Sequence, residues 1–362
     1  MEIKDFSIFD ILEKSGERKI VTWGAGRAFD SFCQMFKEYQ FHKHVEFIID
    51  IDEKKNNCKK IIMGKEIKIV KPSMGVFLKD IKWVIVITTQ YLKDVMDMLE
   101  TLCIGKDVEI CFFGFVKDSY SSWKLKNGYM NCSIVNDGHE IPKLIHYCWF
   151  GRKPLPYDYK VWIKTWKKFC PDYEMIEWNE DNYDLSKSTY AMEAYERGMW
   201  AFVSDYVCLD VVYDYGGVYM DTDVEMIKSI EPLRHQIAFC GFQDEMSVAL
   251  GLGFGSVKNN PIIREMRDDY DSINFILPSG RENLTSCAVY QTRVLSAHGM
   301  KMNGRFQKLE HINVYPKVFF SPMNHYNRKI EINENSFLIH HWSGSWFEQK
   351  MKESWIYMKD IF

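Results

Sequence analysis

The chain has 362 residues, of which 46% are hydrophobic and 15% aromatic, and its formal net charge is −4. This length and hydrophobic content predict a well-packed globular protein, with two domains as the default expectation. The small acidic excess argues against nucleic acid as a partner, because nucleic-acid-binding proteins ordinarily carry clustered positive charge.

The two ends of the chain and its cysteines indicate a cytoplasmic protein. The first residues, MEIKDFSIFDILEKSG, place charges among the apolar side chains, unlike a signal peptide. Ten cysteines occur without a Cys-x-x-Cys pair, which favours free thiols over disulfides or a zinc site. The last residues, KMKESWIYMKDIF, mix lysines with aromatics. They favour a solvated terminal helix, with peripheral contact at the inner face of a membrane as the alternative.

Residues 18–115 predict a doubly wound, parallel α/β sheet, because short apolar strands alternate with amphipathic helices. The predicted strands are KIVTWGAG, which runs into a glycine turn, VEFIIDID, which ends in acids, KWVIVITT and EICFFGF. The predicted helices are AFDSFCQMFKEYQ and YLKDVMDMLETL. We assign residues 1–117 to a Rossmann-like domain on this pattern.

Gly24 and Gly26 form a turn between the first strand and the first helix of that domain. Such a turn directs backbone N–H groups toward an anion, and Asp50 lies where a ribose-binding carboxylate would follow the next strand. Phe29 stands where the dinucleotide-binding pattern has its third glycine. A ligand site at Gly24, Gly26 and Asp50 is therefore one interpretation, and a scaffold without a ligand is favoured over it.

The polar, turn-rich residues 118–140 predict a linker. From residue 141 the regular alternation ends, and strands and helices are mixed with more tryptophan. We assign residues 141–362 to a second α/β domain.

The stretch GGVYMDTDVEM at 216–226 is the strongest candidate for a functional site. In one extended strand, Tyr219, Asp221 and Asp223 would share a face. Two adjacent carboxylates repel each other unless a cation lies between them, and Mg²⁺ or Mn²⁺ accepts such oxygen ligands. The alternative is a solvated turn. Asp-x-Asp also occurs at 50–52 and 269–271, so the pattern alone does not decide.

The stretch MWAFVSDYVCLDVVYDYGG at 199–217 predicts a largely apolar helix with Ser204 and Asp205 near its start. A carboxylate in that position is often a helix cap. The sequence leaves open whether Asp205 caps the helix or takes part in a site.

Three segments in order, IPKLIHYCWFG at 141–151, AFVSDYVCLDVVYDYGGVYMDTDVE at 201–225 and HHWSGSW at 340–346, resemble the DXD-containing sugar transferases. These include capsular-polysaccharide glycosyltransferases, yeast-type mannosyltransferases and the catalytic domains of glucosylating toxins. The resemblance covers residues 141–348. It implies a GT-A type α/β domain that transfers a sugar from a nucleotide donor with retention, using Mn²⁺ or Mg²⁺.

The resemblance also implies roles for residues. Asp221 and Asp223 match the Asp-x-Asp motif, which binds the metal and the donor nucleotide. Asp205, with Ser204, matches a Ser-Asp motif that contacts the donor sugar, so Asp205, Asp221 and Asp223 are the candidate catalytic residues.

The flanking segments supply the other candidates. Trp149 and His146 belong to an Ile-His-x-x-Trp segment that contacts the nucleotide base. The C-terminal segment implies His341 as a third metal ligand and Trp346 as a lid over the phosphates. Cys208 stands where the family often has an arginine, and Arg197 is a candidate replacement for that charge.

The resulting expectation is a metal-dependent retaining glycosyltransferase with a nucleotide-sugar donor, UDP-linked before GDP-linked. Its acceptor would be a glycan or lipid-linked glycan of capsule or surface polysaccharide. The alternatives are a nucleotide-sugar-binding scaffold with weak catalysis and an NAD-dependent sugar oxidoreductase acting through the first domain.

Overall fold

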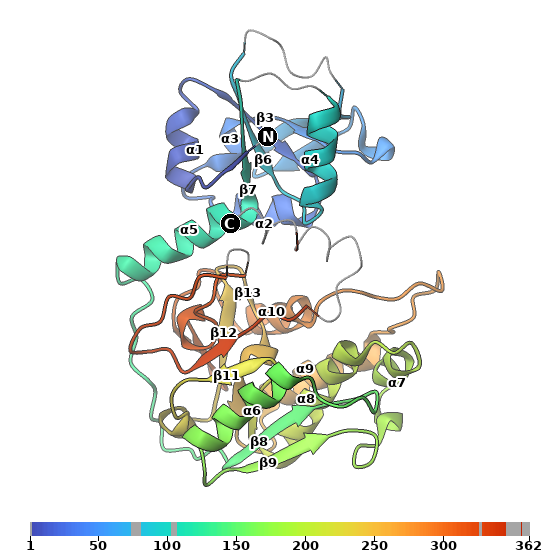
Figure 1. Ribbon diagram of the computed structural model, residues 1–362, viewed down its shortest axis with the longest axis vertical. Coiled ribbons are helices and arrows are strands. Elements are labelled where there is room, and N and C mark those ends of the chain that lie inside the picture. The colour runs from blue at the N-terminus through green and yellow to red at the C-terminus, as the bar shows by residue number, and fades with distance from the viewer. Residues whose placement is uncertain (1, 74–80, 103–106, 326–327, 345–355, 357–362) are drawn as a thin grey trace. The chain divides into compact units, whose positions relative to one another are not determined.

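The structure is a computed structural model that describes residues 2–73, 81–102, 107–325, 328–344 and 356 (Figure 1). The chain divides into two compact units. Unit 1 is formed mainly by Met1–Asn127, and unit 2 by Gly128–Asn324 and the segment that begins at Lys329. In the described part of the chain, no helix has both the length and the apolar character needed to cross a membrane.

Unit 1 is built on a seven-stranded sheet with the order β1-β7-β6-β2-β3-β5-β4. The strands are β1 (Ile3–Lys4), β2 (Lys19–Trp23), β3 (Val45–Ile49), β4 (Lys59–Ile62), β5 (Lys65–Val70), β6 (Trp83–Ile87) and β7 (Val108–Phe112). All neighbouring pairs are parallel except β4 with β5. Every residue of β6 is buried, as expected for a central strand covered on both faces.

The helices of unit 1 are α1 (Ile8–Lys14), α2 (Arg27–Met35), α3 (Phe41–His44), α4 (Leu92–Thr101) and α5 (Phe113–Lys126). Helix α2 buries Phe29, Phe32 and Cys33 along one face, so Phe29 packs in the core beneath the helix. The mixed α/β class predicted for this part of the chain is confirmed. Helix α5 corrects the predicted linker at 118–140, because residues 118–126 are helical and bury Tyr120 and Lys124.

Unit 2 contains an eight-stranded mixed sheet with the order β15-β16-β12-β14-β10-β8-β9, in which β13 also pairs with β12. Its strands are β8 (Leu144–Cys148), β9 (Glu174–Trp178), β10 (Gly217–Tyr219), β12 (Ala238–Asp244), β13 (Ser247–Val248), β14 (Phe254–Ser256), β15 (Gln307–Lys308) and β16 (Asn313–Tyr315). A separate antiparallel pair joins β11 (Val224–Met226) to β17 (Leu338–His340).

The helices of unit 2 are α6 (Tyr157–Phe169), α7 (Thr189–Glu196), α8 (Trp200–Tyr215), α9 (Pro261–Asp268) and α10 (Cys287–Ala297). Helix α8 is apolar nearly all round and runs through the core, where it packs against α7, α9 and the central strands (Figure 1). The chain leaves α8 through two glycines and enters β10. Gly217 is required there, because a Cβ would lie 2.8 Å from the Cβ of Leu144 and 2.9 Å from Nε2 of His146.

Candidate functional site

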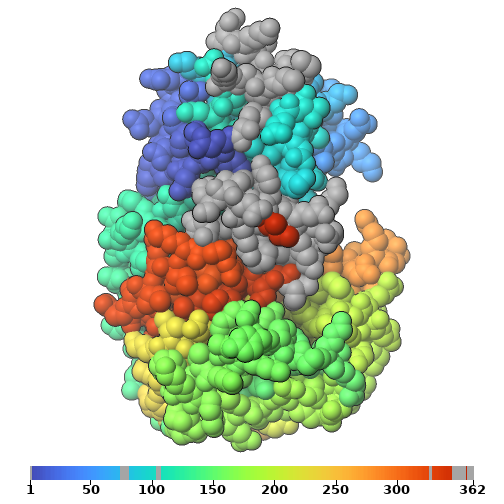
Figure 2. All heavy atoms as spheres, in the orientation of Figure 1, coloured from blue at the N-terminus to red at the C-terminus, as the bar shows by residue number. Residues whose placement is uncertain are grey.

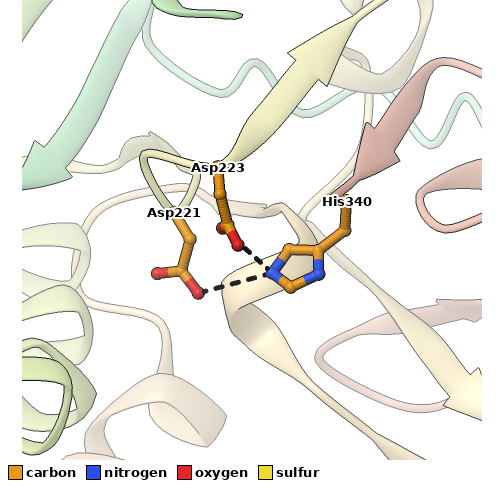
Figure 3. A group of neighbouring side chains, drawn as sticks. All are labelled: Asp221, Asp223 and His340. Carbon is orange, nitrogen blue, oxygen red and sulfur yellow. Dashed lines mark ion pairs between the residues drawn. The ribbon is translucent and has the colours of Figure 1, made fainter. Parts of the chain in front are cut away.

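Asp221, Asp223 and His340 form a cluster whose potential ligand atoms all lie within 4.8 Å of one another (Figure 3). Nε2 of His340 lies 3.2 Å from Oδ1 of Asp223 and 3.9 Å from Oδ2 of Asp221. His340 is only 7% exposed and Asp223 is buried, whereas Asp221 is half-buried. Two carboxylates and one imidazole therefore converge on one point.

The turn between β10 and β11 brings the two aspartates together. Asp221 follows β10, where its N–H donates to the carbonyl of Gly251 at 3.0 Å, and the N–H of Val224 donates back to the carbonyl of Asp221 at 3.1 Å. The prediction of one continuous strand is corrected, because the chain turns at residues 221–223 and passes from the large sheet into the β11–β17 pair. The carboxylates converge through this turn and not through strand periodicity.

The β11–β17 pair supplies the histidine. Val224 is the register partner of His340, which places that imidazole beside Asp223 although the two residues are more than a hundred positions apart in the chain. This pairing fixes which of the two adjacent histidines faces the aspartates.

Three further residues, whose role here the sequence does not predict, hold the carboxylates in place. The hydroxyl of Tyr219 donates to Oδ1 of Asp221 at 3.0 Å. The N–H of Ser343 donates to Oδ2 of Asp223 at 2.8 Å. Gly251 lies so close that a Cβ there would be 2.2 Å from Oδ2 of Asp221. The only signals for these residues in the sequence were the alternation of Tyr219 with Asp221 and a glycine-rich stretch around Gly251.

The cluster is strongly coupled by charge. Burial alone would lower the pKa of His340, but the carboxylates of Asp223 and Asp221 outweigh it and raise that pKa from 6.5 to about 9. Burial alone would raise the pKa of Asp223, but the charge and hydrogen bond of His340 hold it well below its ordinary value. The proton on Nε2 of His340 is therefore held toward Asp223 at neutral pH when no cation lies between the carboxylates.

His341, the predicted metal ligand, points elsewhere. Its Nε2 lies 2.9 Å from Oε2 of Glu225, and its ring stacks on Trp162 with centroids 4.2 Å apart. The structure thus replaces His341 with His340 as the candidate ligand, because successive side chains in a strand point to opposite faces. Trp346, the predicted lid, lies outside the described residues, as does nearly all of the C-terminal segment.

Residues 156–240 match the model of a family described as the glycosyltransferase sugar-binding region containing the DXD motif. Asp221 and Asp223 lie inside this match, at the cluster that the geometry picks out. This segment of the chain is similar to the DXD-containing glycosyltransferases.

The relatives are distant. Over 151 residues the chain is 24% identical to inositol phosphoceramide mannosyltransferase 3 of Schizosaccharomyces pombe, and the match covers 40% of this chain and 41% of that protein. Among solved structures, the PaToxG glycosyltransferase shares 18% identity at a TM-score of 0.37, over 51% of this chain and 78% of that one. A glycosyltransferase involved in glycosylation of the major capsid of PBCV-1 shares 8% sequence identity at a TM-score of 0.33. The match covers 60% of this chain and 100% of that one.

Asp205, the predicted donor-sugar contact, is the sixth residue of α8 and does not cap it, since the N-cap is Met199. Its side chain is half-buried. Its pKa is raised from 3.8 to about 7, mainly because burial disfavours the charged carboxylate. A hydrogen bond with Cys287 partly opposes this increase, and the negative charge of Asp221 adds to it. Cys287, the first residue of α10, was not predicted as part of the site. Ser204 donates to the carbonyl of Trp200 within the helix.

His146 has a structural role in place of the predicted nucleotide contact. It is fully buried, its Nδ1 accepts from Nε1 of Trp178 at 3.1 Å, and its Nε2 therefore donates to the carbonyl of Gly216 at 2.8 Å. Burial lowers its pKa to about 4, so it stays neutral. Trp149 is half-buried and packs edge-on against Tyr159 at 5.7 Å, so it remains a candidate base contact.

Arg197 does not replace the family arginine in this structure. It lies at the C-terminal end of α7, where Nη1 is 3.1 Å from Oε1 of Glu282. Cys208 is buried on α8, and its thiol donates to the carbonyl of Asp205. The thiol of Cys208 therefore supplies no positive charge in place of the arginine that the family often has at this position.

The glycine turn of unit 1 is occupied by the chain's own groups. The carboxylate of Asp50 accepts from the N–H groups of Ala25 and Asp52 at 2.8 and 2.9 Å and from Nζ of Lys55 at 3.1 Å. Ala25, between Gly24 and Gly26, therefore contacts an internal carboxylate. In the triplet at 269–271, Asp269 pairs with Arg293, so that triplet is not gathered into a cluster.

Proposed function

We propose that this protein is a metal-dependent, retaining glycosyltransferase that moves a sugar from a nucleotide-sugar donor to a glycan acceptor. The observation that carries the proposal is the convergence of Asp221, Asp223 and His340 within a segment matched to a DXD sugar-binding region. The match to this family supports transfer of a sugar, and the cluster supports dependence on a divalent cation.

The residues of the cluster fit such a cation. Two carboxylates supply hard oxygen ligands and His340 supplies an imidazole, a mixed set that suits Mn²⁺ better than Mg²⁺. The proton that the two carboxylates hold on His340 supports a site that accepts positive charge. A metal ion there would take the place of the proton on Nε2.

The chain's residues would act by position rather than by covalent attack. A bound divalent ion stabilises the negative charge that develops on the leaving diphosphate, worth several kcal/mol of the barrier. Tyr219 and Ser343 fix the orientation of the two carboxylates. Asp205, whose pKa of about 7 leaves it partly protonated at neutral pH, can both donate and accept hydrogen bonds with sugar hydroxyls.

The donor and acceptor are proposed by class. A UDP-sugar is the first candidate donor and a GDP-sugar the second, and the name of the fission-yeast relative adds mannosyl donors to those worth testing. The proposed acceptor is a glycan or lipid-linked glycan of a capsule or surface polysaccharide, reached from the cytoplasmic side.

Nucleotide release tests the proposal. The wild-type protein is incubated with UDP- and GDP-sugars, with Mn²⁺ or with a chelator, beside Asp223→Ala and the matched control Asp271→Ala from the other Asp-x-Asp triplet of this unit. We expect release that requires Mn²⁺, is lost in Asp223→Ala and persists in Asp271→Ala. Mn²⁺-dependent binding of a donor without release, even with glycan acceptors present, would favour a nucleotide-sugar-binding scaffold.

The oxidoreductase alternative is tested by titrating NAD. The internal hydrogen bonds of Asp50 argue against it, and we expect no binding at the glycine turn. Tight binding of NAD would reinstate that alternative.

A further inference from the structure

One face of helix α6 carries lysines around two apolar side chains. At 100° per residue, six exposed residues fall within an arc of about 120°. They are Tyr157, Lys160, Val161, Lys164, Lys167 and Lys168. We call this set the α6 basic face. The segment that contains α6 lies at the surface of the view in Figure 2.

The lysines of the α6 basic face lie apart from acidic partners in the described part of the chain. Within the described residues, none of its four lysines forms an ion pair, and the one acid of the helix, Asp158, lies to the side of the arc. The chain as a whole is acidic, with a net charge of −4, so this local excess is not a consequence of overall composition. An unneutralised positive surface on an acidic protein favours an anionic partner.

Apolar side chains accompany the charge. Tyr157 is 79% exposed and Val161 is 40% exposed, both between the lysines on the helix surface. Lysines beside exposed aromatic and aliphatic groups are typical of helices that lie in the interface of an anionic membrane. The surface is one convex helix side, which meets a flat array of headgroups more readily than it encloses a single glycan chain.

The opposite face of α6 packs against the segments that carry His340 and Asp223. Trp162 stacks on His341, next to His340, and Nε1 of Trp166 donates to the carbonyl of Val224 in β11 at 2.8 Å. The helix therefore has a fixed position relative to Asp223. A surface that docks through α6 would hold the cluster at a set distance from that surface.

We propose that the α6 basic face docks this protein on a membrane surface that contains anionic lipids. The docking does not rest on the transfer activity. It deepens the proposed function by placing the site beside a membrane, where a lipid-linked acceptor would lie.

Vesicle flotation of the full chain tests this proposal. Vesicles of phosphatidylcholine alone are compared with vesicles that also contain phosphatidylglycerol, at low and high salt. The test variant replaces Lys160, Lys164, Lys167 and Lys168 by glutamine. The control variant makes the same change at four exposed lysines elsewhere, Lys126, Lys258, Lys301 and Lys308, so both variants lose the same charge.

We expect wild type to bind only the anionic vesicles and to lose binding at high salt, because salt screens surface charges. The α6 variant should bind at least about tenfold more weakly, since each lysine near an anionic surface is worth roughly a fivefold change in affinity. The control variant should lose much less of its affinity for the anionic vesicles. Both variants should keep the wild-type unfolding temperature and the wild-type Mn²⁺ affinity in solution.

Three results would overturn the proposal. They are equal binding to both vesicle types, equal loss in the two variants, and tighter binding to a soluble anionic polysaccharide than to the vesicles. Nucleotide release measured without vesicles shows whether the proposed function has failed as well. The lysines of the α6 basic face lie outside the cluster of Asp221, Asp223 and His340, so a failure of docking alone would leave this release unchanged.

Discussion

At the scale of single residues, the proposed metal would compete with a proton for His340. The imidazole lies 3.2 Å from Asp223 and carries a proton because the two carboxylates raise its pKa from 6.5 to about 9. Without metal, the pair stabilises the fold fully between about pH 4, above which Asp223 is ionised in both states, and about pH 6.5, below which His340 is protonated in both states. That stabilisation is lost as the pH rises through about 9.

The same proton must leave when a metal binds. We predict that Mn²⁺ affinity rises by about tenfold per pH unit up to about pH 9 and then levels off, because one proton is displaced. Calorimetry in buffers of different ionisation enthalpy should show about one proton released per ion bound. His340→Gln should flatten the pH dependence, and His341→Gln should keep it; the reverse pattern would restore His341 as the ligand.

The second prediction concerns Asp205 and the pH dependence of the free energy of unfolding. Its pKa is raised from 3.8 to about 7, so its contribution to folding is fully present below pH 3.8 and is lost as the pH rises to 7. In the presence of a chelator, Asp205→Asn should therefore raise the free energy of unfolding above pH 7. The upper bound is about 4 kcal/mol, reduced by solvent access to the side chain.

Urea unfolding of wild type and Asp205→Asn across this pH range measures the effect. Asp271→Asn is the control, because Asp271 is exposed and its replacement should leave the pH profile unchanged. A wild-type stability that does not fall between about pH 5 and pH 7 relative to Asp205→Asn would contradict the assignment. Nucleotide release should fall in Asp205→Asn even as stability rises.

At the scale of elements, the turn between β10 and β11 forms the site. Asp221 packs against the segment Leu250–Leu252, and its N–H and carboxylate both lie against Gly251. The carboxylate keeps its place only because this neighbour has no side chain.

Gly251→Ala should therefore weaken metal binding while leaving the fold largely intact. A Cβ would lie 2.2 Å from Oδ2 of Asp221, and the flexible carboxylate can move away from it only by leaving the cluster. We expect Mn²⁺ affinity to fall at least about tenfold, or ~1.4 kcal/mol, by titration. Gly26→Ala is the matched control, since a Cβ there meets no heavy atom within 4 Å; a similar loss in both variants would remove the special role of Gly251.

Local patterns predicted the central strands β2, β3, β6 and β7 with helices α2, α4 and α8, because each carries its own periodicity, and did not predict β1, β4, β5, α1 or α3. Strand β6 is a continuous apolar run, and α2 buries Phe29 and Phe32 at helical spacing. The same reasoning failed where one short apolar run is shared between two sheets, as at 216–226. It also missed α5, whose polar sequence folds as a helix with half its residues buried.

At the scale of the whole molecule, the site depends on pairing between distant segments. The sequence supplied Asp221, Asp223 and a pair of adjacent histidines, and from the sequence alone these could not be separated. Only the register of β11 with β17 sets His340 opposite Val224 and turns His341 toward Glu225. The burial of His146 and the hydrogen bonds of Asp50 are likewise tertiary features that no local pattern predicts.

Pulsed electron paramagnetic resonance of Mn²⁺ bound together with a nucleoside diphosphate tests the central claim most directly. If Asp221, Asp223 and His340 hold the ion that meets the donor, the spectrum will show coupling to one imidazole nitrogen and to phosphorus. His340→Gln will lose the nitrogen coupling, and His341→Gln will keep both. Phosphorus coupling without nitrogen in the wild-type protein would mean that His340 is no ligand, and no protein-bound Mn²⁺ at all would contradict the metal site itself.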